Sequence, residues 1–325
     1  MSELYFSIVI PSYNRPDLAL RAIKSAQANM IEGDELWIIN DGSTIDYNAV
    51  SVYCDQQSSL HYVLVENGGV SHARNIGIEN AKNAHIALLD DDDEWITGHL
   101  AAHRAAYKAN LSLVAAFSDF FNGPNDDQLL PNGISRWSTH KRDHRNALSL
   151  LEVSSTRYSV YYGDLYLDQL QADHILPSAM SFNKQLIGSE LRFELGLKRN
   201  ESWLFSSSCC KKGHVAFVDA SLAIQHAPEI HRATNISAEE TMLSRIYVME
   251  KLWGRDEDFL MGNLKDYNRW YFNDFYGVFR GALSTLKLSL LWRAYRIMGI
   301  KRFLFLSFES CIAILKGKKP ITRNS

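Results

Sequence analysis

Short apolar runs alternate with amphipathic stretches along the first third of the chain. The apolar runs are four to six residues long and lie at Tyr5–Ile10, Leu36–Ile39, His61–Val65 and His85–Leu89. Runs of this length are typical of buried strands, whereas apolar residues three and four apart mark one face of a helix. Residues 18–26 show the helical spacing, and residues 47–57 and 71–81 are also predicted helices. This alternation of strand and helix with short links predicts a parallel, doubly wound α/β sheet.

Each predicted strand ends in a polar or glycine-rich turn. The turns contain Tyr13, Asp41, Gly68 with Gly69, and the run Asp90 to Asp93. Parallel strands bring such turns to one edge of the sheet, where open α/β sheets bind ligands. A nucleotide cleft is one interpretation, and ordinary polar α/β loops are the other. The first strand is not followed by Gly-x-Gly-x-x-Gly and the chain has no Walker motif, which argues against a dinucleotide cofactor.

The four consecutive aspartates Asp90 to Asp93 are the strongest chemical signal in the sequence. Carboxylates crowded together repel one another, and a hard divalent cation with oxygen ligands would relieve that repulsion. A solvated acidic turn is the simpler alternative. An EF-hand loop is excluded, because counting from Asp90 places Trp95 at the glycine position and Ala101 at the glutamate position.

Composition narrows the class of protein. The 325 residues carry a formal net charge of −3, which gives no overall signal for nucleic acid. The four cysteines show no CxxC spacing, as expected for reduced thiols in the cytoplasm. The first apolar run ends at Pro11 and follows no basic segment, so we interpret it as a strand and not as a signal peptide. No stretch of about 18 apolar residues suggests a membrane span.

The C-terminal tail has a different pattern. From Leu283 onward leucines and aromatic residues are interleaved with lysines and arginines, and Glu309 is the only acid. Basic amphipathic helices with aromatic residues bind anionic membrane surfaces, and each basic residue near such a surface contributes about 1 kcal/mol. The tail therefore predicts peripheral contact with the inner face of the cytoplasmic membrane. A helix pair packed on the rest of the protein with its basic face in water is the alternative.

Four motifs in register resemble the GT-A fold glycosyltransferases of family 2. The motifs are Phe6–Arg15, Asn40–Thr44, Ala73–Gly77 and Leu89–Trp95. The resemblance is close over the first third and continues weakly to around Ser237. It implies a GT-A (Rossmann-like) catalytic domain over residues 1–228, with helices on both faces of its sheet. It leaves residues 229–325 as a helical region that ends in the basic tail. It also implies an inverting transferase that uses a nucleotide-diphosphate sugar and Mn²⁺ or Mg²⁺.

The resemblance assigns the nucleotide-binding residues. Pro11, Tyr13 and Asp41 would hold the base and ribose, and Arg74 would lie near the nucleotide and pyrophosphate. Family members often carry an aspartate where this chain has Asn40. An asparagine can still hydrogen-bond a base edge, although it has no charge. Arg74 could equally be a surface arginine of its helix.

The same resemblance identifies Asp90 and Asp92 as the carboxylates of the DxD motif. Asp92 would bind the metal directly, while Asp90 and Asp91 would contact the nucleotide sugar. His231 lies in a segment similar to the family's late histidine segment near the metal and diphosphate, with His226 as the alternative. A metal bridging Asp92 and the phosphates would stabilise the leaving diphosphate as a Lewis acid. Loss of one such contact costs about 3 kcal/mol.

An inverting displacement also needs a base for the acceptor hydroxyl. The family pattern has Glu-Asp at the start of a late helix, with the aspartate as base, whereas this chain has Glu201-Ser202. Glu201 is the candidate base, because burial in a cleft can raise the pKa of a carboxyl group. The alternatives are another carboxylate, a slow or inactive enzyme, or a Glu201 that only stabilises the helix start.

Two later segments complete the expectations. Residues 122–143 are predicted to form a long acceptor-facing loop, and residues 174–182 resemble the family's strand that lines the sugar pocket. The main hypothesis is a transferase that adds one sugar to a growing, lipid-linked bacterial surface glycan. A catalytically impaired sugar-nucleotide scaffold or sensor is the second hypothesis. A nucleotidyltransferase is the third, although Pro11 to Asn14 stand where that class has a glycine-rich turn.

Overall fold

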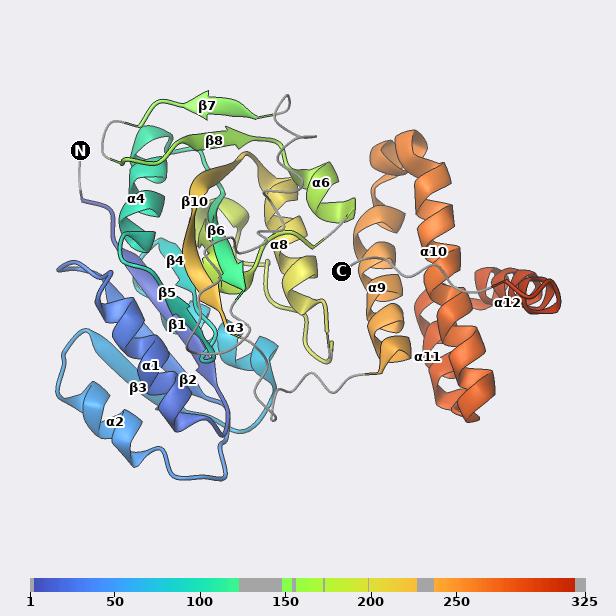
Figure 1. Cartoon of the computed structure of the whole chain (residues 1–325), viewed down its shortest axis with the longest axis horizontal. Coiled ribbons are helices and arrows are strands. Elements are labelled where there is room, and N and C mark those ends of the chain that lie inside the picture. Colours follow the sequence, from blue (N-terminus) through green and yellow to red (C-terminus); the bar gives the residue numbers. More distant parts are fainter. Residues whose placement is uncertain are drawn as a thin grey trace. The chain divides into compact units, whose positions relative to one another are not determined.

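The computed structural model describes residues 3–122, 148–153, 156–171, 173–197, 199–226 and 237–318. The chain divides into two compact units. The sheet unit comprises residues 1–196 and 205–229, and the helical unit comprises residues 197–204 and 230–325. Figure 1 shows the labelled strands in the first unit and the helices α9 to α12 in the second. The predicted loop at residues 122–143 lies almost entirely outside the described residues.

The described strands of the sheet unit form one mixed sheet. They are β1 (Phe6–Ser12), β2 (Glu35–Asn40), β3 (Leu60–Leu64), β4 (His85–Leu88), β5 (Asp93–Trp95), β6 (Ala115–Asn122), β7 (Ser149–Leu151), β8 (Val160–Gly163), β9 (Met180–Asn183) and β10 (Val215–Gln225). Their order is β3-β2-β1-β4-β9-β6-β10-β8-β7, and β5 pairs with β10. The first four are parallel neighbours, which confirms the parallel pairing predicted for these strands. β9 enters antiparallel between β4 and β6 and makes the sheet mixed.

Successive residues of a strand point to opposite faces of the sheet, so helices pack on both faces. The helices are α1 (Pro16–Gln27), α2 (Asn48–Asp55), α3 (Val70–Asn80), α4 (His99–Ala109), α6 (Tyr166–Gln171), α7 (Lys184–Ile187) and α8 (Glu201–Lys212), whose first four residues belong to the helical unit. Ile8 packs in a core with Ile23 of α1, whereas its neighbour Val9 packs in a second core with Ile78 of α3. Gly77 is required here, because a Cβ atom would lie 2.3 Å from Val9 Cγ1.

One predicted strand is only partly regular. Residues 174–182 were expected to form a strand, but the structure has the 3-10 turn η1 (Pro177–Ala179) before β9 begins at Met180. Proline cannot donate a ladder hydrogen bond, so a strand through Pro177 is disfavoured. The turn instead places Ser178, which is fully buried, beneath the acidic run that follows β4.

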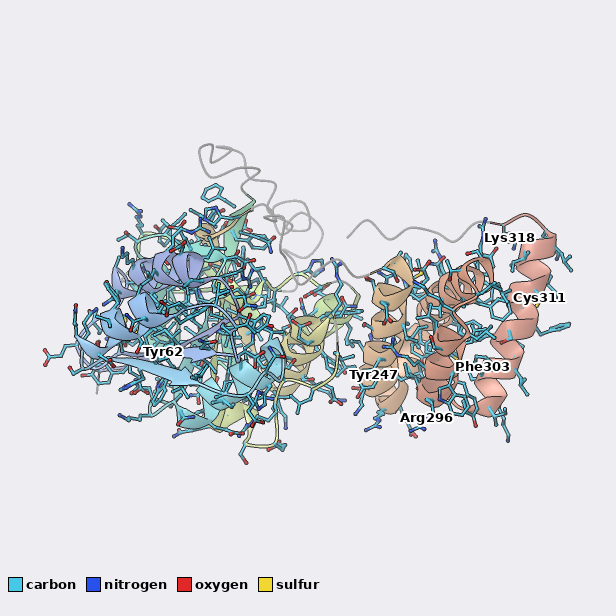
Figure 2. The ribbon with its side chains drawn as sticks, turned by 90° about the horizontal axis from the view of Figure 1, so that it is seen from below. Tyr62, Tyr247, Arg296, Phe303, Cys311 and Lys318 are labelled. Atoms are coloured by element: carbon cyan, nitrogen blue, oxygen red, sulfur yellow. The ribbon has the colours of Figure 1, made fainter. Side chains whose placement is uncertain are left out.

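The helical unit packs its helices around a separate apolar core. Its described elements are α9 (Ala238–Leu252), η2 (Trp253–Arg255), α10 (Glu257–Thr285), α11 (Leu288–Met298) and α12 (Ile300–Leu315). Ser237 caps α9 by accepting a hydrogen bond from the amide of Glu240. Asn263 interrupts α10 with a non-helical backbone (φ −127°). Figure 2 shows Phe303 on α12, where its ring contacts those of Phe275 on α10 and Tyr295 on α11.

Three arginine–carboxylate pairs join these helices. Arg245 of α9 donates through Nε and Nη2 to the fully buried Asp274 of α10 at 2.6–3.1 Å. Arg293 reaches Glu240 at 2.6 Å, and Arg302 pairs with Glu250. Each of these arginines therefore meets one carboxylate. Within the described ranges, no helix combines the length and the apolar character needed to cross a membrane.

Candidate active site

The carboxyl ends of β1, β2 and β4 bring the predicted nucleotide-binding residues to one edge of the sheet. Pro11 is buried within β1, and Tyr13 follows that strand with 42% of its surface exposed. Asp41 follows β2, and the acidic run begins two residues after β4 ends at Leu88. The parallel pairing of β1 with both β2 and β4 makes these ends neighbours, as the polar turns in the sequence predict.

Asp41 organises the loop that precedes α3. It is buried, and its two carboxylate oxygens accept hydrogen bonds from the backbone amides of Gly68 and Gly69 at 2.9 and 2.8 Å. Asn67 donates to the Asp41 carbonyl at 2.8 Å. A carboxylate that accepts several amide hydrogen bonds is held rigidly. Asp41 therefore fixes the backbone of this glycine loop, a role that the sequence did not reveal.

Arg74 is a buried arginine and not a surface residue of α3. Its side chain is 3% exposed, and Nη2 lies 2.6 Å from Asp90 Oδ1. The guanidinium group also packs over the ring of Phe193, with 5.0 Å between Cζ and the ring centroid. The structure thus brings together two of the predicted residues, Arg74 and Asp90, from α3 and from the end of β4.

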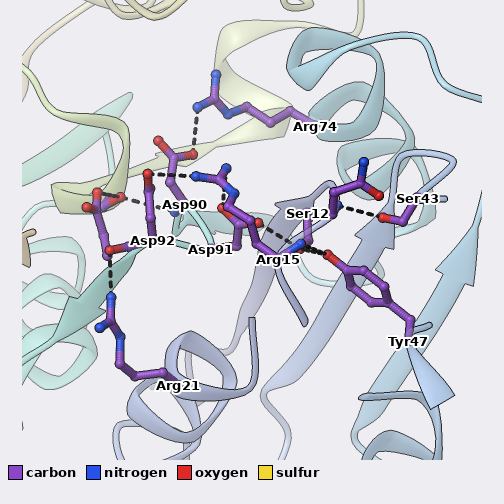
Figure 3. A network of polar contacts seen from close by, with 12 residues as sticks. Ser12, Arg15, Arg21, Ser43, Tyr47, Arg74, Asp90, Asp91 and Asp92 are labelled. Atoms are coloured by element: carbon purple, nitrogen blue, oxygen red, sulfur yellow. Dashed lines mark hydrogen bonds and ion pairs between the residues drawn. The ribbon is translucent and has the colours of Figure 1, made fainter. Parts of the chain in front are cut away.

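A second arginine, Arg15, joins the next two aspartates (Figure 3). Its Nη2 lies 2.6 Å from Asp91 Oδ1, and its Nη1 donates to Asp92 Oδ2 at 2.8 Å. Asp91 is 1% exposed and Asp92 is 18% exposed. Asp91 also accepts a hydrogen bond from Ser12 Oγ at 2.7 Å. Arg15 stands in the first quoted motif, but the sequence analysis gave it no role.

The electrostatics of this turn follow from its burial. Burial raises the pKa of Asp91 to about 7, because desolvation outweighs the opposing effect of Arg15 and the neighbouring Asp92 adds to the rise. Burial alone would lower the pKa of Arg15, but Asp91, Asp92 and Asp90 raise it above its ordinary value. Arg15 therefore stays positively charged among the carboxylates of the turn.

Hydrogen bonds of Ser178, and of Trp95 in β5, hold the acidic turn in place. The Ser178 hydroxyl donates to Asp93 Oδ2 at 2.5 Å and accepts from the Asp90 amide at 3.1 Å. Trp95 donates from Nε1 to the Ser178 carbonyl at 2.6 Å. Asp93 is therefore buried and turned away from the exposed side of the cluster. Asp90 and Asp92 keep 25% and 18% of their side chains exposed.

The donor set fits a nucleotide-linked magnesium or manganese ion. Such ions take one or two protein carboxylates together with phosphate oxygens and water, and Asp90 and Asp92 offer two hard, partly exposed carboxylates. Among the residues that the structure describes, no three histidine, cysteine or acidic side chains form a complete metal-binding group. A dedicated all-protein metal cage is therefore not seen in that part of the chain.

His231, His226 and Glu201 are the remaining predicted residues. His231 lies outside the described residues. His226, the alternative, follows β10 and pairs through Nε2 with Glu94 at 2.8 Å, and Arg21 Nε lies 3.2 Å from the same carboxylate oxygen. Glu201 is the first residue of α8 and groups with the helical unit. Its assignment as a base remains a prediction.

Comparisons with known proteins agree with this architecture. Residues 7–159 match the profile described as "Glycosyl transferase family 2". An uncharacterized glycosyltransferase of Rickettsia conorii is 39% identical over 93 residues, which cover 29% of this chain and 15% of that protein. WcaA of Escherichia coli K12, a glycosyl transferase assigned to colanic acid biosynthesis, is 32% identical over 102 residues, or 30% of this chain and 36% of that protein.

Solved structures match over almost the whole chain. Staphylococcus aureus TarS 1–349 in complex with UDP-GlcNAc has a TM-score of 0.59 and 13% identity, and the match covers 99% of this chain and 95% of that one. The mannosyltransferase PcManGT of Pyrobaculum calidifontis, in complex with GDP-Man and Mn²⁺, has a TM-score of 0.53 and 13% identity, with coverages of 97% and 88%.

The sheet order, the acidic turn at its carboxyl edge and these structural matches define a GT-A type α/β fold with a helical C-terminal region. The match over residues 7–159 assigns this part of the chain to glycosyltransferase family 2. Both conclusions confirm what the four motifs predict.

Proposed function

We propose that this protein is a metal-dependent, inverting glycosyltransferase that moves a sugar from a nucleotide-diphosphate donor to an acceptor hydroxyl. The observation that carries the proposal is the pair of partly exposed carboxylates, Asp90 and Asp92, at the carboxyl edge of the parallel strands. Open α/β sheets bind ligands at that edge. TarS bound to UDP-GlcNAc and PcManGT bound to GDP-Man, which have a similar fold, support a nucleotide-sugar donor.

The donor site uses the strand ends. Pro11, the exposed Tyr13 and Asp41 would hold the base and ribose, and Asp41 also fixes the glycine loop. Arg74, fixed by Asp90 and Phe193, is available for a charge-assisted contact with the diphosphate. Asp91 contributes indirectly to the donor site, because Ser12 and Arg15 already contact its carboxylate.

Mn²⁺ or Mg²⁺ would be held by Asp92, with Asp90 beside it and His231 as a second protein ligand. The bound metal would supply Lewis-acid stabilisation of the departing diphosphate. PcManGT, which is described with Mn²⁺, supports this choice of ion. Glu201 would take the proton of the acceptor hydroxyl.

The acceptor would be a growing bacterial surface glycan carried on a lipid. The similarity to WcaA, which is assigned to colanic acid biosynthesis, supports a polysaccharide product. A catalytically impaired sugar-nucleotide scaffold is the second candidate. One observation favours it, since Ser202 follows Glu201 where the family pattern has an aspartate.

The tail would bring the protein to the cytoplasmic face of the membrane. The inner face of α12 packs through Leu306, Ser310 and Ala313, yet its outer face is also apolar. Large side chains on the outer face are 55–86% exposed: Ile300, Leu304, Phe305, Phe308 and Leu315. Exposed lysines at both ends of α12, Lys301 and Lys316, complement an anionic bilayer. Figure 2 shows Cys311 on the same helix and Lys318 just after its C-terminal end.

A donor screen tests the enzymatic proposal. UDP- and GDP-sugars are added with and without Mn²⁺, and the melting temperature and the release of nucleotide are measured. We expect one donor to raise the melting temperature only with Mn²⁺, because a bound ligand stabilises the folded state by mass action, and to be turned over with an acceptor. Stabilisation without any turnover on every acceptor would favour the scaffold. No stabilisation by any donor would contradict both candidates.

Vesicle sedimentation tests the membrane proposal. The double variant Phe305→Ser/Phe308→Ser should reduce the fraction bound to anionic vesicles by about tenfold or more, because burial of each phenylalanine contributes about 2 kcal/mol. The control is Leu64→Ser/Leu111→Ser, which removes two leucines of the sheet unit that are 62% and 71% exposed. Equal binding of the two double variants would refute the role of α12, as would a wild-type protein that does not bind vesicles.

A further inference from the structure

Arg15 links a buried and an exposed carboxylate of the acidic turn. Its Nη2 lies 2.6 Å from Asp91 Oδ1 and its Nη1 lies 2.8 Å from Asp92 Oδ2. Asp91 is 1% exposed, whereas Asp92 is 18% exposed and is the carboxylate assigned to the metal. One guanidinium group, with a single positive charge, therefore contacts an inner carboxylate and an outer one at the same time.

The inner half of this arrangement is anchored by a closed set of hydrogen bonds. The Arg15 amide donates to Tyr47 Oη at 2.8 Å, and Tyr47 Oη lies 2.7 Å from Ser12 Oγ. Ser12 Oγ donates to Asp91 Oδ2 at 2.7 Å. Because the single hydroxyl proton of Ser12 goes to Asp91, the Tyr47 hydroxyl must donate to Ser12. The direction of each bond is thus settled, and the ring closes through the Arg15 guanidinium (Figure 3).

The outer half is exchangeable. Asp91 and the ring keep the Arg15 side chain in place even when its second nitrogen leaves Asp92. The planar fork of arginine suits two carboxylates at once, which a lysine cannot match with one ammonium group. The contact with Asp92 is also the more exposed of the two, since Asp92 is 18% exposed and Asp91 only 1%.

We propose that Arg15 is a positioning residue that occupies Asp92 in the donor-free protein, where it competes with the metal and makes metal binding depend on the arrival of a nucleoside diphosphate. The inference rests on the metal-dependent function proposed above. The inference adds an order of binding to that function. The donor-free protein binds the ion weakly, and the diphosphate and the ion bind together.

The physical reason is competition for one oxygen. A guanidinium group and a divalent cation repel each other and both neutralise Asp92. A diphosphate supplies new acceptors that guanidinium groups bind well, and it also supplies metal ligands. It therefore relieves the competition from both sides. Because coupling between two ligands is reciprocal, the ion must strengthen nucleotide binding by the same factor.

Arg21 provides a matched control. It lies beside the same turn, and its Nη2 donates to the backbone carbonyl of Asp92 at 3.0 Å, while its Nε lies 3.2 Å from Glu94. Its side chain is 26% exposed, the same fraction as that of Arg15. Arg21→Met thus removes an equal charge near the turn without removing the contact of Arg15 with the Asp92 carboxylate.

The test measures binding of Mn²⁺ by the electron paramagnetic resonance signal of the free ion, with and without UDP or GDP. Arg15→Met should bind Mn²⁺ about tenfold more tightly than wild type without nucleotide, and its gain in affinity on adding nucleotide should be smaller by about the same factor. Arg21→Met should change the nucleotide-free affinity by less than about threefold. Unchanged or weaker Mn²⁺ binding by Arg15→Met would overturn the proposal.

A milder variant keeps the test informative if Arg15→Met does not fold. Tyr47→Phe keeps every charge and the aromatic packing but removes the hydroxyl that holds Ser12 and the Arg15 amide. It should shift the nucleotide-free Mn²⁺ affinity in the same direction by about two- to threefold, and a shift in the opposite direction would count against the proposal. A wild type that binds no Mn²⁺ even with nucleotide would contradict the proposed function itself. Wild-type binding that depends on nucleotide, with no change in Arg15→Met, would refute only the role of Arg15.

Discussion

The helical unit and the acidic turn of the sheet unit use arginine in different ways. In the helical unit Arg245, Arg293 and Arg302 each meet one carboxylate, so each charge is matched by one partner. At the edge of the sheet, Arg15 is shared between two carboxylates that differ in burial. A matched pair resists change, because removal of either partner leaves a charge uncompensated. A shared arginine can release one partner and keep the other, which is useful at a site that has to accept a cation.

The largest expected effect concerns Asp92, the outer partner of Arg15. Asp92→Ala should reduce sugar transfer by more than about a hundredfold, because loss of one electrostatic contact to the developing charge costs about 3 kcal/mol. The melting temperature should change little, since Asp92 is partly exposed. Product formation with the best donor and Mn²⁺ provides the measurement. Full activity in this variant after chelation of metal would refute the metal mechanism.

The loss of stability on substitution should differ between Arg15, which two carboxylates share, and Arg245, which has one carboxylate partner. Arg245→Met leaves the fully buried Asp274 uncompensated and should lower the free energy of unfolding by about 3 kcal/mol. Arg15→Met should cost about 1 kcal/mol, because Asp92 faces water and the buried Asp91, whose pKa burial raises to about 7, can take up a proton when Arg15 is lost. Urea unfolding of both variants gives the comparison. A larger loss for Arg15→Met than for Arg245→Met would contradict the distinction between the two kinds of pair.

Acid should act on the sheet unit before the helical unit. Burial lowers the pKa of His103 to about 3, and burial with the nearby Arg104 lowers that of His85 to about 4. Burial likewise lowers the pKa of His99, which stacks on His103. The sequence of the helical unit, residues 197–204 and 230–325, contains His231 as its one histidine.

The sign follows from proton uptake. Below the ordinary histidine pKa of about 6.5 the unfolded chain binds protons that the folded sheet unit does not, so stability is complete above that pH and falls as the pH drops toward 4. Each such histidine should lower the free energy of unfolding by about 1.4 kcal/mol for each unit of pH lost in this range. Urea unfolding at pH 7 and pH 5 measures the loss, and His103→Gln should reduce it. Earlier acid unfolding of the helical unit would contradict this account.

The smallest expected effect concerns the start of α9. Ser237 Oγ accepts from the Glu240 amide at 3.3 Å, and Glu240 is also the partner of Arg293. Ser237→Ala should cost about 1 kcal/mol, the usual effect of a lost N-cap, while Ser237→Asp should restore most of it. Thermal unfolding measures both variants, and a loss as large as that of Arg245→Met would show that the cap is coupled to the ion pair.

The strand order and the edge of the sheet were predictable, because they depend on local patterns. The apolar runs predicted β1 to β4 to within two residues, and the polar residues after them include Asp41 and the acidic run, whereas Arg74 was assigned only by the motif resemblance. The motif resemblance supplied the GT-A fold. These features need no knowledge of distant contacts.

Residues that act through partners far along the chain were not predictable. Tyr47 contacts Ser12 across 35 positions and Ser178 contacts Asp93 across 85, and neither residue belongs to a motif. Arg15 was visible in a motif, but its role depends on which aspartates lie beside it in space. The antiparallel insertion of β9 was missed for the same reason, since pairing between distant strands leaves no local pattern.

The central claim is that the acidic turn after β4 holds a cation together with a nucleoside diphosphate. Calorimetric titration of Mn²⁺ into the wild type and Asp92→Asn, with saturating UDP or GDP, tests it most directly. We predict one strong Mn²⁺ site in the wild type that depends on the nucleotide and is weakened by at least about thirtyfold in Asp92→Asn. Equal Mn²⁺ affinity in the two proteins would contradict the claim.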